Sequence, residues 1–336
     1  MTQALREFAF RKNKFVDRRL FVDALARMRC VRPLDEYLYI GMGGPSLEDH
    51  RALHSMLGIE MLLSFDENVS LIERQKLNAP SEKMRYLHMS AKELVDQLDA
   101  VIRDAGFPDD AGRIIWLDYM KPGQLGHQLQ EFRGLLSALE ANDVVKITLN
   151  ADPDSLGRPK KDESTNVDAD TALTAHRITV LKSRLAEFGP AKIGEADISK
   201  NGFPSILAKS VEKVVNDAFP PSSSLTLAPI SLIRYADGLQ MLTICAAVLD
   251  STSDKSAFAR KTGFSTWPLY SATWDQIHHV DIPFLTAQER ALLEHQISRS
   301  EEPNSLGVFF EGDVETALTQ YKLFRRYYPN FQHVWF

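Results

Sequence analysis

The stretch that most limits how this chain can fold is an apolar run, residues 37–40, that ends in a cluster of glycines. Three glycines follow it within four positions: Gly41, Gly43 and Gly44. A helical pattern over 46–57 leads to a second apolar run, 60–65, which two acids follow: Asp66 and Glu67. Glycines let backbone approach a ligand, and an acid after the second strand can accept hydrogen bonds from a ribose diol. This order predicts a nucleotide-binding half-fold.

Strand and helix patterns alternate from about residue 36 to residue 150. The expected strands are 37–40, 60–65, 85–88, 113–117 and 144–149, and the expected helices are 46–57, 69–77, 91–105 and 124–141. Short apolar runs that alternate with helices predict a parallel sheet covered on both faces. Such a sheet binds ligands beyond the carboxyl ends of its strands. Polar or glycine-rich residues follow all five runs, so we expect one shared ligand crevice.

A second clear pattern lies further along the chain. Two apolar runs, 230–235 and 239–248, flank an Asp237-Gly238 turn, and this predicts an antiparallel hairpin. Helix patterns at 171–187 and 205–218 precede the hairpin. Near the C-terminus, the spacing of Thr286 and Glu289 predicts a capped helix start.

Five parallel-type strands followed by an antiparallel hairpin resemble the class I S-adenosylmethionine-dependent methyltransferases. The resemblance covers roughly residues 31–250. It implies an α/β fold with a doubly wound, mostly parallel, seven-stranded sheet and an antiparallel C-terminal hairpin. Outside this Rossmann-like domain we expect a basic N-terminal helical arm, residues 1–30, and a small α+β extension, residues 257–336.

The resemblance assigns roles to residues at the strand ends. Three glycines look like the turn that contacts the methionine moiety of S-adenosylmethionine: Gly41, Gly43 and Gly44. Asp66 or Glu67 is similar to the ribose-binding acid, and Asp66 is preferred because it directly follows the last apolar residue. Ser90 is placed like the residue near the adenine. Asp118 and Tyr119 match the fourth-strand position, where the family carries catalytic or metal-binding groups.

The segment Asp118-x-x-Lys121 looks like that of metal-dependent small-molecule O-methyltransferases, in which the Asp binds a divalent cation and the Lys deprotonates a hydroxyl. A cation favours the oxyanion of a hydroxyl group, and a nearby lysine can take its proton. Asn150 and Asp152 follow the fifth strand and carry the hard oxygen donors that suit Mg²⁺. The resemblance therefore implies a metal site made of Asp118, Asn150 and Asp152, with Lys121 or Tyr119 assisting proton removal.

Composition narrows the class of protein further. The 336-residue chain has a net charge of −6, which does not favour nucleic acid as a partner. Its two cysteines, Cys30 and Cys245, lie far apart in apolar contexts and are expected to be buried thiols of a reducing compartment. No apolar run approaches the ~20 residues that span a membrane, and the N-terminus lacks a signal pattern. We expect a cytoplasmic protein.

Two functional hypotheses follow. The first is an S-adenosylmethionine-dependent O-methyltransferase that acts on a hydroxyl-bearing substrate, with possible help from Mg²⁺. The second is an inactive methyltransferase-like subunit that senses nucleotides or scaffolds an assembly. Met42 and Pro45, which depart from the usual glycine motif, favour the second. It would meet a protein partner, or a second copy, through the basic N-terminal helix and the aromatic segment 324–336. A nicotinamide-dependent oxidoreductase is a third interpretation, and the hairpin argues against it.

Overall fold

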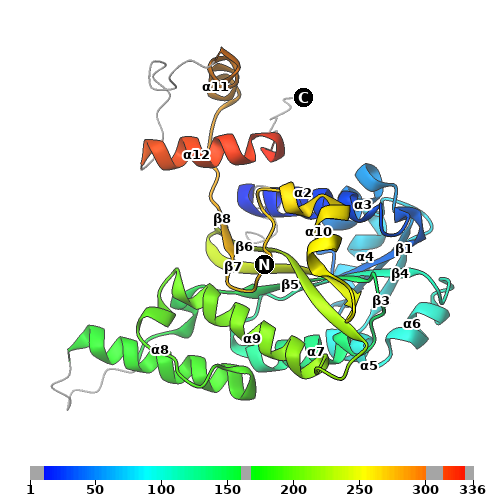
Figure 1. Cartoon of the computed structure of the whole chain (residues 1–336), viewed down its shortest axis with the longest axis horizontal. Helices are drawn as coiled ribbons and strands as arrows, with labels where there is room; N and C mark the ends of the chain where they lie inside the picture. The colour runs from blue at the N-terminus through cyan, green and yellow to red at the C-terminus, as the bar shows by residue number, and fades with distance from the viewer. Residues whose placement is uncertain (1–10, 160–167, 300–312, 330–336) are drawn as a thin grey trace. The chain divides into compact units, whose positions relative to one another are not determined.

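The computed structural model describes residues 11–159, 168–299 and 313–329. Its sheet has eight strands in the order β3-β2-β1-β4-β5-β7-β6-β8 (Figure 1). They are β1 (Tyr37–Gly41), β2 (Met61–Asp66), β3 (Arg85–His88), β4 (Gly112–Asp118), β5 (Val144–Asn150), β6 (Leu225–Asp237), β7 (Leu239–Asp250) and β8 (Ile277–Val280). The first five run parallel, and β7 pairs antiparallel with β5. The doubly wound sheet and its hairpin are confirmed, and β8 adds an eighth strand to the seven expected.

The parallel strands form where the sequence has continuous apolar runs. Every residue of β1 and β5 is buried, as expected for strands covered on both faces. The register aligns the strand ends, because Gly41 lies beside Ser64 of β2 and Trp116 of β4. The carboxyl ends of neighbouring strands therefore meet at one edge of the sheet.

Helices flank the sheet on both faces. Those of the alternating region are α3 (Glu48–Leu57), α4 (Val69–Leu77), α5 (Ala91–Asp96), α6 (Leu98–Asp104) and α7 (Leu125–Leu136). Those that follow are α8 (Ala169–Leu185), α9 (Gly202–Ala218) and α10 (Lys255–Thr262). In Figure 1, α7 and α9 lie on one face, whereas α3 and α10 lie on the other. The helix expected over 91–105 is divided at Gln97 into α5 and α6.

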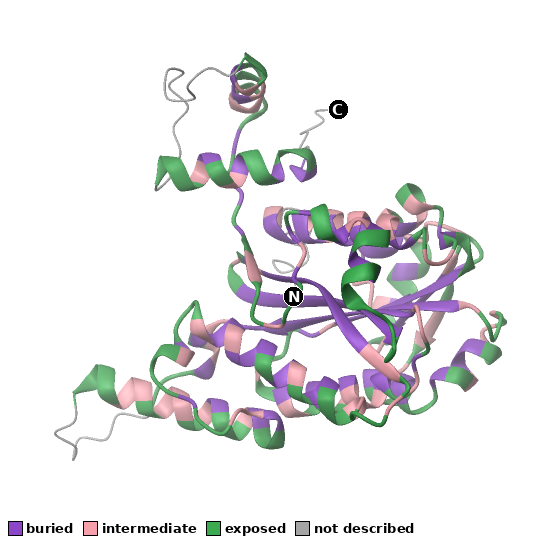
Figure 2. Cartoon of the chain, in the orientation of Figure 1, coloured by how far each residue is buried: buried purple, intermediate pink, exposed green. Residues whose placement is uncertain are grey.

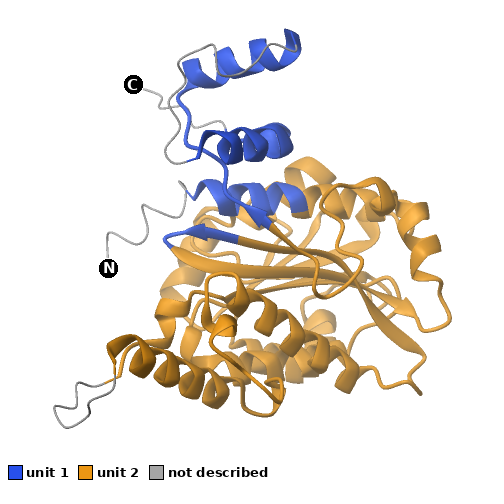
Figure 3. Cartoon of the chain, turned by 60° about the vertical axis from the view of Figure 1, so that its left-hand side comes forward, with its two compact units in different colours: residues 1–20, 235–238, 279–336 blue, residues 21–234, 239–278 orange. Residues whose placement is uncertain are grey.

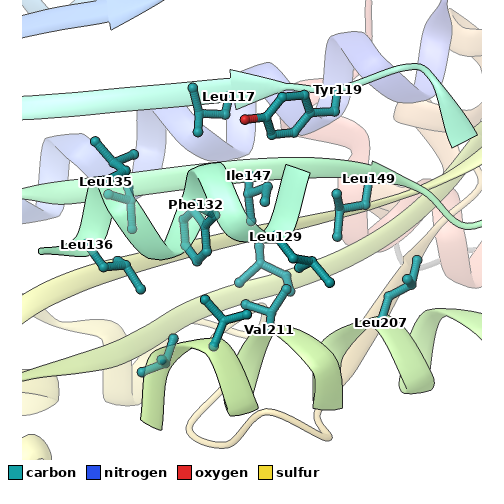
Figure 4. Close-up of a cluster of buried hydrophobic side chains, with 14 of the residues drawn as sticks. Leu117, Tyr119, Leu129, Phe132, Leu135, Leu136, Ile147, Leu149, Leu207 and Val211 are labelled. Atoms are coloured by element: carbon teal, nitrogen blue, oxygen red, sulfur yellow. The ribbon is translucent and has the colours of Figure 1, made fainter. Parts of the chain in front are cut away.

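The main apolar core lies between the sheet and helices α7 and α9. Side chains of β4 and β5 interdigitate there with Phe132 of α7 and Leu207 and Val211 of α9 (Figure 4). The three are at most 1% exposed, and β4 and β5 are buried along their length except at Asp118 (Figure 2). This packing holds α7 against the sheet. The positions of the side chains on α7 that lie outside the core are therefore set by the core.

The chain divides into two compact units, residues 21–234 with 239–278 and residues 1–20 with 235–238 and 279–336 (Figure 3). In the smaller unit the carboxylate of Asp237 accepts hydrogen bonds from the backbone amides of Asn13 (3.1 Å) and Lys14 (2.8 Å). These amides lie at the start of α2 (Lys12–Met28), so the hairpin tip caps this helix. The expected domain boundaries stay a prediction.

The basic N-terminal helix differs from expectation. Lys12 pairs with Asp281 at 3.7 Å, and Lys14 is only 4% exposed. In the larger unit, the guanidinium of Arg27 stacks on Trp267 at 5.5 Å and donates to the carbonyl of Gly263. Several cations of the basic N-terminal helix are therefore paired within the fold.

Two further expectations concern the cysteines and the C-terminal region. Cys245 is buried as expected, but Cys30 is exposed, because its helix ends there. The capping box is confirmed, since Thr286 donates its amide to Glu289 at 2.7 Å where α11 (Ala287–Arg299) begins. The last described α-helix is α12 (Val314–Phe324), and residues 330–336 of the aromatic segment lie outside the described part of the chain.

No described helix combines the length and the apolar character needed to cross a membrane.

Candidate functional site

A cavity of about 290 Å³ lies at the carboxyl ends of β1, β2, β3 and β4. Its lining comes from these strand ends and from α7: Met42, Phe65, Asp66, Glu67, Met89, Ala91, Asp118, Tyr119, Met120, Lys121, Gln124, Gln128 and Glu131. This size is near the lower end for small-molecule sites. The crevice expected at this edge therefore exists for the first four strand ends but does not include the end of β5, and its lining combines apolar side chains, carboxylates and Lys121.

The glycine corner, residues 41–44, forms the β1 side of the site through Met42. A Cβ on Gly43 would lie 2.5 Å from Cδ2 of Leu47, and the φ of Gly43 is +67°. A Cβ on Gly41 would lie 2.6 Å from the hydroxyl oxygen of Tyr39. Both glycines are thus required by their own packing. Gly44, with a φ of +58°, has open space where a Cβ would stand, and its amide donates to the carbonyl of Met42 at 2.8 Å, so glycine is needed there for its backbone conformation alone.

A buried glutamine from α4 holds the glycine corner. The Gln75 amide nitrogen donates to the carbonyls of Met42 and Gly44, each at 3.0 Å. Its oxygen accepts a hydrogen bond from the Ser64 hydroxyl at 2.9 Å, and both side chains are fully buried. Because these hydrogen bonds satisfy the side chain of Gln75, it acts as a brace for the corner.

His50 of α3 supports the corner from below. It is fully buried, and its Nε2 lies 3.1 Å from the carbonyl oxygen of Leu63. Its ring also meets Tyr39 edge-on, with 4.7 Å between ring centroids. Burial lowers the pKa of His50 to about 4, so the ring is neutral and donates to Leu63 at neutral pH. His50 is part of the packing and does not line the cavity.

The acids after β2 both line the cavity but differ in their partners. One Asp66 oxygen accepts the amide of Asn68 at 2.7 Å, and the other has no partner in the described chain. Burial, and then the neighbouring Glu67, raise the pKa of Asp66. Glu67 is 66% exposed and pairs with the ammonium of Lys121 at 3.8 Å.

The end of β4 brings three expected residues to the same cavity: Asp118, Tyr119 and Lys121. The Tyr119 hydroxyl donates to Glu131 of α7 at 2.5 Å, and its ring lies among core side chains (Figure 4). Burial and the charge of Glu131 raise the pKa of Tyr119 well above its ordinary value. Lys121 is 70% exposed at the rim.

The expected metal ligands are not brought together. Asn150 and Asp152 do not line the cavity that Asp118 lines. The Asn150 oxygen accepts the amide of Asp152 at 3.1 Å, and the Asp152 carboxylate accepts the amides of Asp154 (3.0 Å) and Gln240 (3.2 Å). These oxygens stabilise turns after β5. Across the described ranges, no group of three His, Cys, Asp or Glu side chains is arranged to hold a metal ion.

Ser90 also differs from its expected place beside a ligand. It caps α5 through a capping box, with its hydroxyl bonded to Glu93 at 2.8 Å. Its neighbours Met89 and Ala91 line the cavity instead. The capping pattern Ser-x-x-Glu was present in the sequence and could have shown this use.

Sequence reasoning missed the contribution of α7. Gln128 and Glu131 line the cavity from this helix, ten and thirteen positions after Asp118. The strand-end argument covers only residues that directly follow a strand. The available signal was two polar residues, spaced i and i+3, on a helix that is otherwise apolar toward the sheet.

A family model described as "Putative O-methyltransferase" matches residues 7–336. No curated protein sequence matches this chain significantly.

Solved structures with similar chains show low identity and low structural scores. Trm1 from Pyrococcus horikoshii, solved with S-adenosyl-L-methionine, has 12% identity and a TM-score of 0.42 over 92% of this chain and 75% of its own. The O-methyltransferase TomG from Streptomyces achromogenes has 15% identity and a TM-score of 0.36 over 68% and 78%. A protein from Bordetella parapertussis has 12% identity and a TM-score of 0.34 over 67% of this chain and 65% of its own, just under two thirds.

Proposed function

We propose that this chain, which belongs to the O-methyltransferase family whose model spans residues 7–336, transfers a methyl group from S-adenosylmethionine to a hydroxyl group of a small molecule. The observation that carries the proposal is the cavity at the carboxyl ends of the parallel strands. It joins apolar walls to Asp66 at one strand end and Asp118 at another. This is the place where doubly wound sheets bind nucleotide-like ligands.

The residues present fit an adenosyl group. The second oxygen of Asp66 lacks a partner in the described structure and can accept from a ribose hydroxyl. We prefer Asp66 to Glu67 for this role because Glu67 is mostly exposed and pairs with Lys121. Met42 is the corner residue that lines the cavity, so the methionine moiety would meet the corner there, whereas Gly41, Gly43 and Gly44 shape the corner.

Methyl transfer to a hydroxyl oxygen requires a group that orients the hydroxyl and accepts its proton. When bound, S-adenosylmethionine supplies an electrophilic methyl on a sulfonium. We assign the general-base role to the Asp118 carboxylate at the end of β4, and we place Lys121 beside it to stabilise negative charge on the substrate oxygen. The raised pKa of Tyr119 keeps its hydroxyl protonated, which makes it a hydrogen-bond donor to Glu131 and a poor base.

The chain's own residues do not fit the Mg²⁺ site that the sequence implied. The amide and carboxylate oxygens of Asn150 and Asp152 already accept backbone amides after β5. The proposal therefore uses no step through a metal ion. Addition of EDTA is expected to leave turnover unchanged.

Calorimetric titration tests the cofactor part of the proposal. The wild-type chain should bind S-adenosylmethionine and S-adenosylhomocysteine, and Asp66→Asn should bind both about tenfold more weakly, because an amide donates where the ribose needs an acceptor. Glu73→Gln, an exposed α4 residue that pairs with Lys76, is the matched control and should bind normally. Absence of binding by the wild type would contradict the proposal.

Turnover tests the catalytic part. Incubation with S-adenosylmethionine and a panel of hydroxyl-bearing small molecules should yield methylated product by mass spectrometry. Asp118→Asn should remove most of this activity while cofactor affinity survives. Cofactor binding without any product from phenols, alcohols or sugars would instead favour the sensing or scaffolding hypothesis.

A further inference from the structure

The α7 side of the cavity carries a buried hydrogen-bond acceptor without a described partner. Gln128 is 3% exposed, and its Nε2 donates to the carbonyl of Lys121 at 2.8 Å, which fixes the orientation of the amide. Its Oε1 is buried and has no hydrogen-bond partner within the described residues. An unsatisfied buried acceptor costs about 1–3 kcal/mol, so this oxygen calls for a partner, and its place in the cavity lining makes a bound ligand one that can supply it.

A second acceptor lies one helical turn further along. Glu131 lines the same cavity, and Tyr119 occupies its Oε2. Nothing in the described parts of the chain donates to its Oε1. Because residues spaced i and i+3 share a helix face, Gln128 and Glu131 present their acceptors to one side of the cavity. An ionised carboxylate only accepts hydrogen bonds, so this pair is complementary to a group with two N–H donors.

The walls beside these acceptors are apolar and suit the flat faces of a base. Four of the lining residues offer this surface: Met42, Phe65, Met89 and Ala91. Methionine thioethers make favourable contacts with aromatic rings, and since Phe65 is only 1% exposed, the half-buried Met42 and Met89 supply more of the accessible surface. A planar heterocycle can therefore lie between these walls with its edge toward α7.

We infer that Gln128 and Glu131 recognise the exocyclic amino group of adenine and so determine which purine this site accepts. The inference rests on the proposed function, because it concerns the base of the same cofactor. The amino group of adenine carries two donors, whereas the 6-oxo group of hypoxanthine or guanine is an acceptor that faces these oxygens unfavourably. Ser90 was expected near the adenine from the sequence, but its side chain caps α5. We therefore assign recognition of the adenine to α7.

The test compares S-adenosylhomocysteine with S-inosylhomocysteine, in which an oxo group replaces the amino group and the neighbouring N1 gains a proton. Titration of the wild-type chain should give at least about tenfold weaker binding of the deaminated ligand, as expected for loss of one good hydrogen bond and unpaired buried acceptors. Gln128→Met and Glu131→Gln should each reduce this ratio, since the first removes the acceptor and the second can donate to the oxo group. Gln130→Met, a change at an exposed α7 position outside this cavity, should leave the ratio unchanged.

The outcomes separate the two proposals. Equal binding of both ligands by the wild type, or an unchanged ratio in both Gln128→Met and Glu131→Gln, would overturn the inference while the proposed function stands. Failure of the wild type to bind S-adenosylhomocysteine would overturn both. Thermal unfolding of each variant verifies that it is folded, and Glu131→Gln preserves the size of the side chain should Gln128→Met fail to fold.

Discussion

The two sides of the cavity are built in different ways. On the β1 side lies the glycine corner, and the side chains behind it form their hydrogen bonds within the fold: Gln75 donates to the carbonyls of the corner, and His50 bonds to the carbonyl of Leu63 in β2. On the α7 side, Gln128 and Glu131 present side-chain acceptors with capacity left over. The glycine corner thus contributes to the stability of the fold, and the α7 side of the cavity contributes to ligand selectivity. Substitutions should affect stability on the first side and ligand selection on the second.

The largest effect on stability is expected at Gly43. Alanine there adds a Cβ 2.5 Å from Leu47 and takes on a φ of +67°. Strain and overpacking together should cost about 3–4 kcal/mol in the free energy of unfolding. Gly44→Ala has a similar φ but open space, and should cost about 1 kcal/mol. Urea denaturation measures both, and equal costs would show that the corner is not packed as described.

Acid should weaken the glycine corner next. The pKa of His50 falls from an ordinary 6.5 to about 4 on folding, so the unfolded chain binds more protons between these values. Stability from this group is therefore complete above about pH 6.5 and is lost as the pH falls toward 4, by about 3 kcal/mol.

Asp143 affects the pH dependence of the free energy of unfolding in the opposite sense to His50. The measurement therefore needs a control that separates the two groups. Burial raises its pKa to about 6, so its contribution favours folding as the pH falls. The difference in pH dependence between wild type and His50→Gln isolates the histidine. A difference that does not change between pH 7 and pH 4 would contradict a buried neutral His50.

Removal of the Gln75 side chain should have an intermediate effect on the free energy of unfolding. Gln75→Leu removes the side-chain donor of the carbonyls of Met42 and Gly44, of which Met42 keeps the amide of Gly44, and should cost about 2 kcal/mol. S-adenosylhomocysteine should also bind more weakly, with its preference over the deaminated ligand kept. Gln130→Leu is the exposed control. Loss of the preference in Gln75→Leu would mean that the two sides of the cavity are not independent.

The smallest effect on stability is expected at Tyr119. Tyr119→Phe removes the hydroxyl that donates to Glu131 and should cost about 1 kcal/mol. Because that bond orients the carboxylate, the preference for the amino-bearing ligand should shrink. Unchanged selectivity, measured by titration of both ligands, would show that Glu131 is positioned without Tyr119.

The glycine corner could be predicted from the sequence, whereas the residues of α7 that line the cavity could not, and the reason is physical. Strand and helix periods are local, so β1, the turn at Gly41–Gly44 and Asp66 can be found from neighbouring residues. The direction of Gln128 depends on how α7 packs against the sheet, which is a non-local outcome. The same limit applies to Asn150 and Asp152, whose oxygen donors are of the right type but are bound by nearby backbone amides. It applies also to β8. This strand has four residues, too few for a clear periodic pattern, and it is recognised by its pairing with β6.

The most direct test of the account is a crystal structure of the wild-type chain with S-adenosylhomocysteine. We expect the ligand in the cavity between Met42 and α7, with a ribose hydroxyl on Asp66 and the adenine amino group within hydrogen-bond distance of Gln128 or Glu131. A ligand found elsewhere, such as in the second hollow beside Arg184 and Phe188, would contradict it.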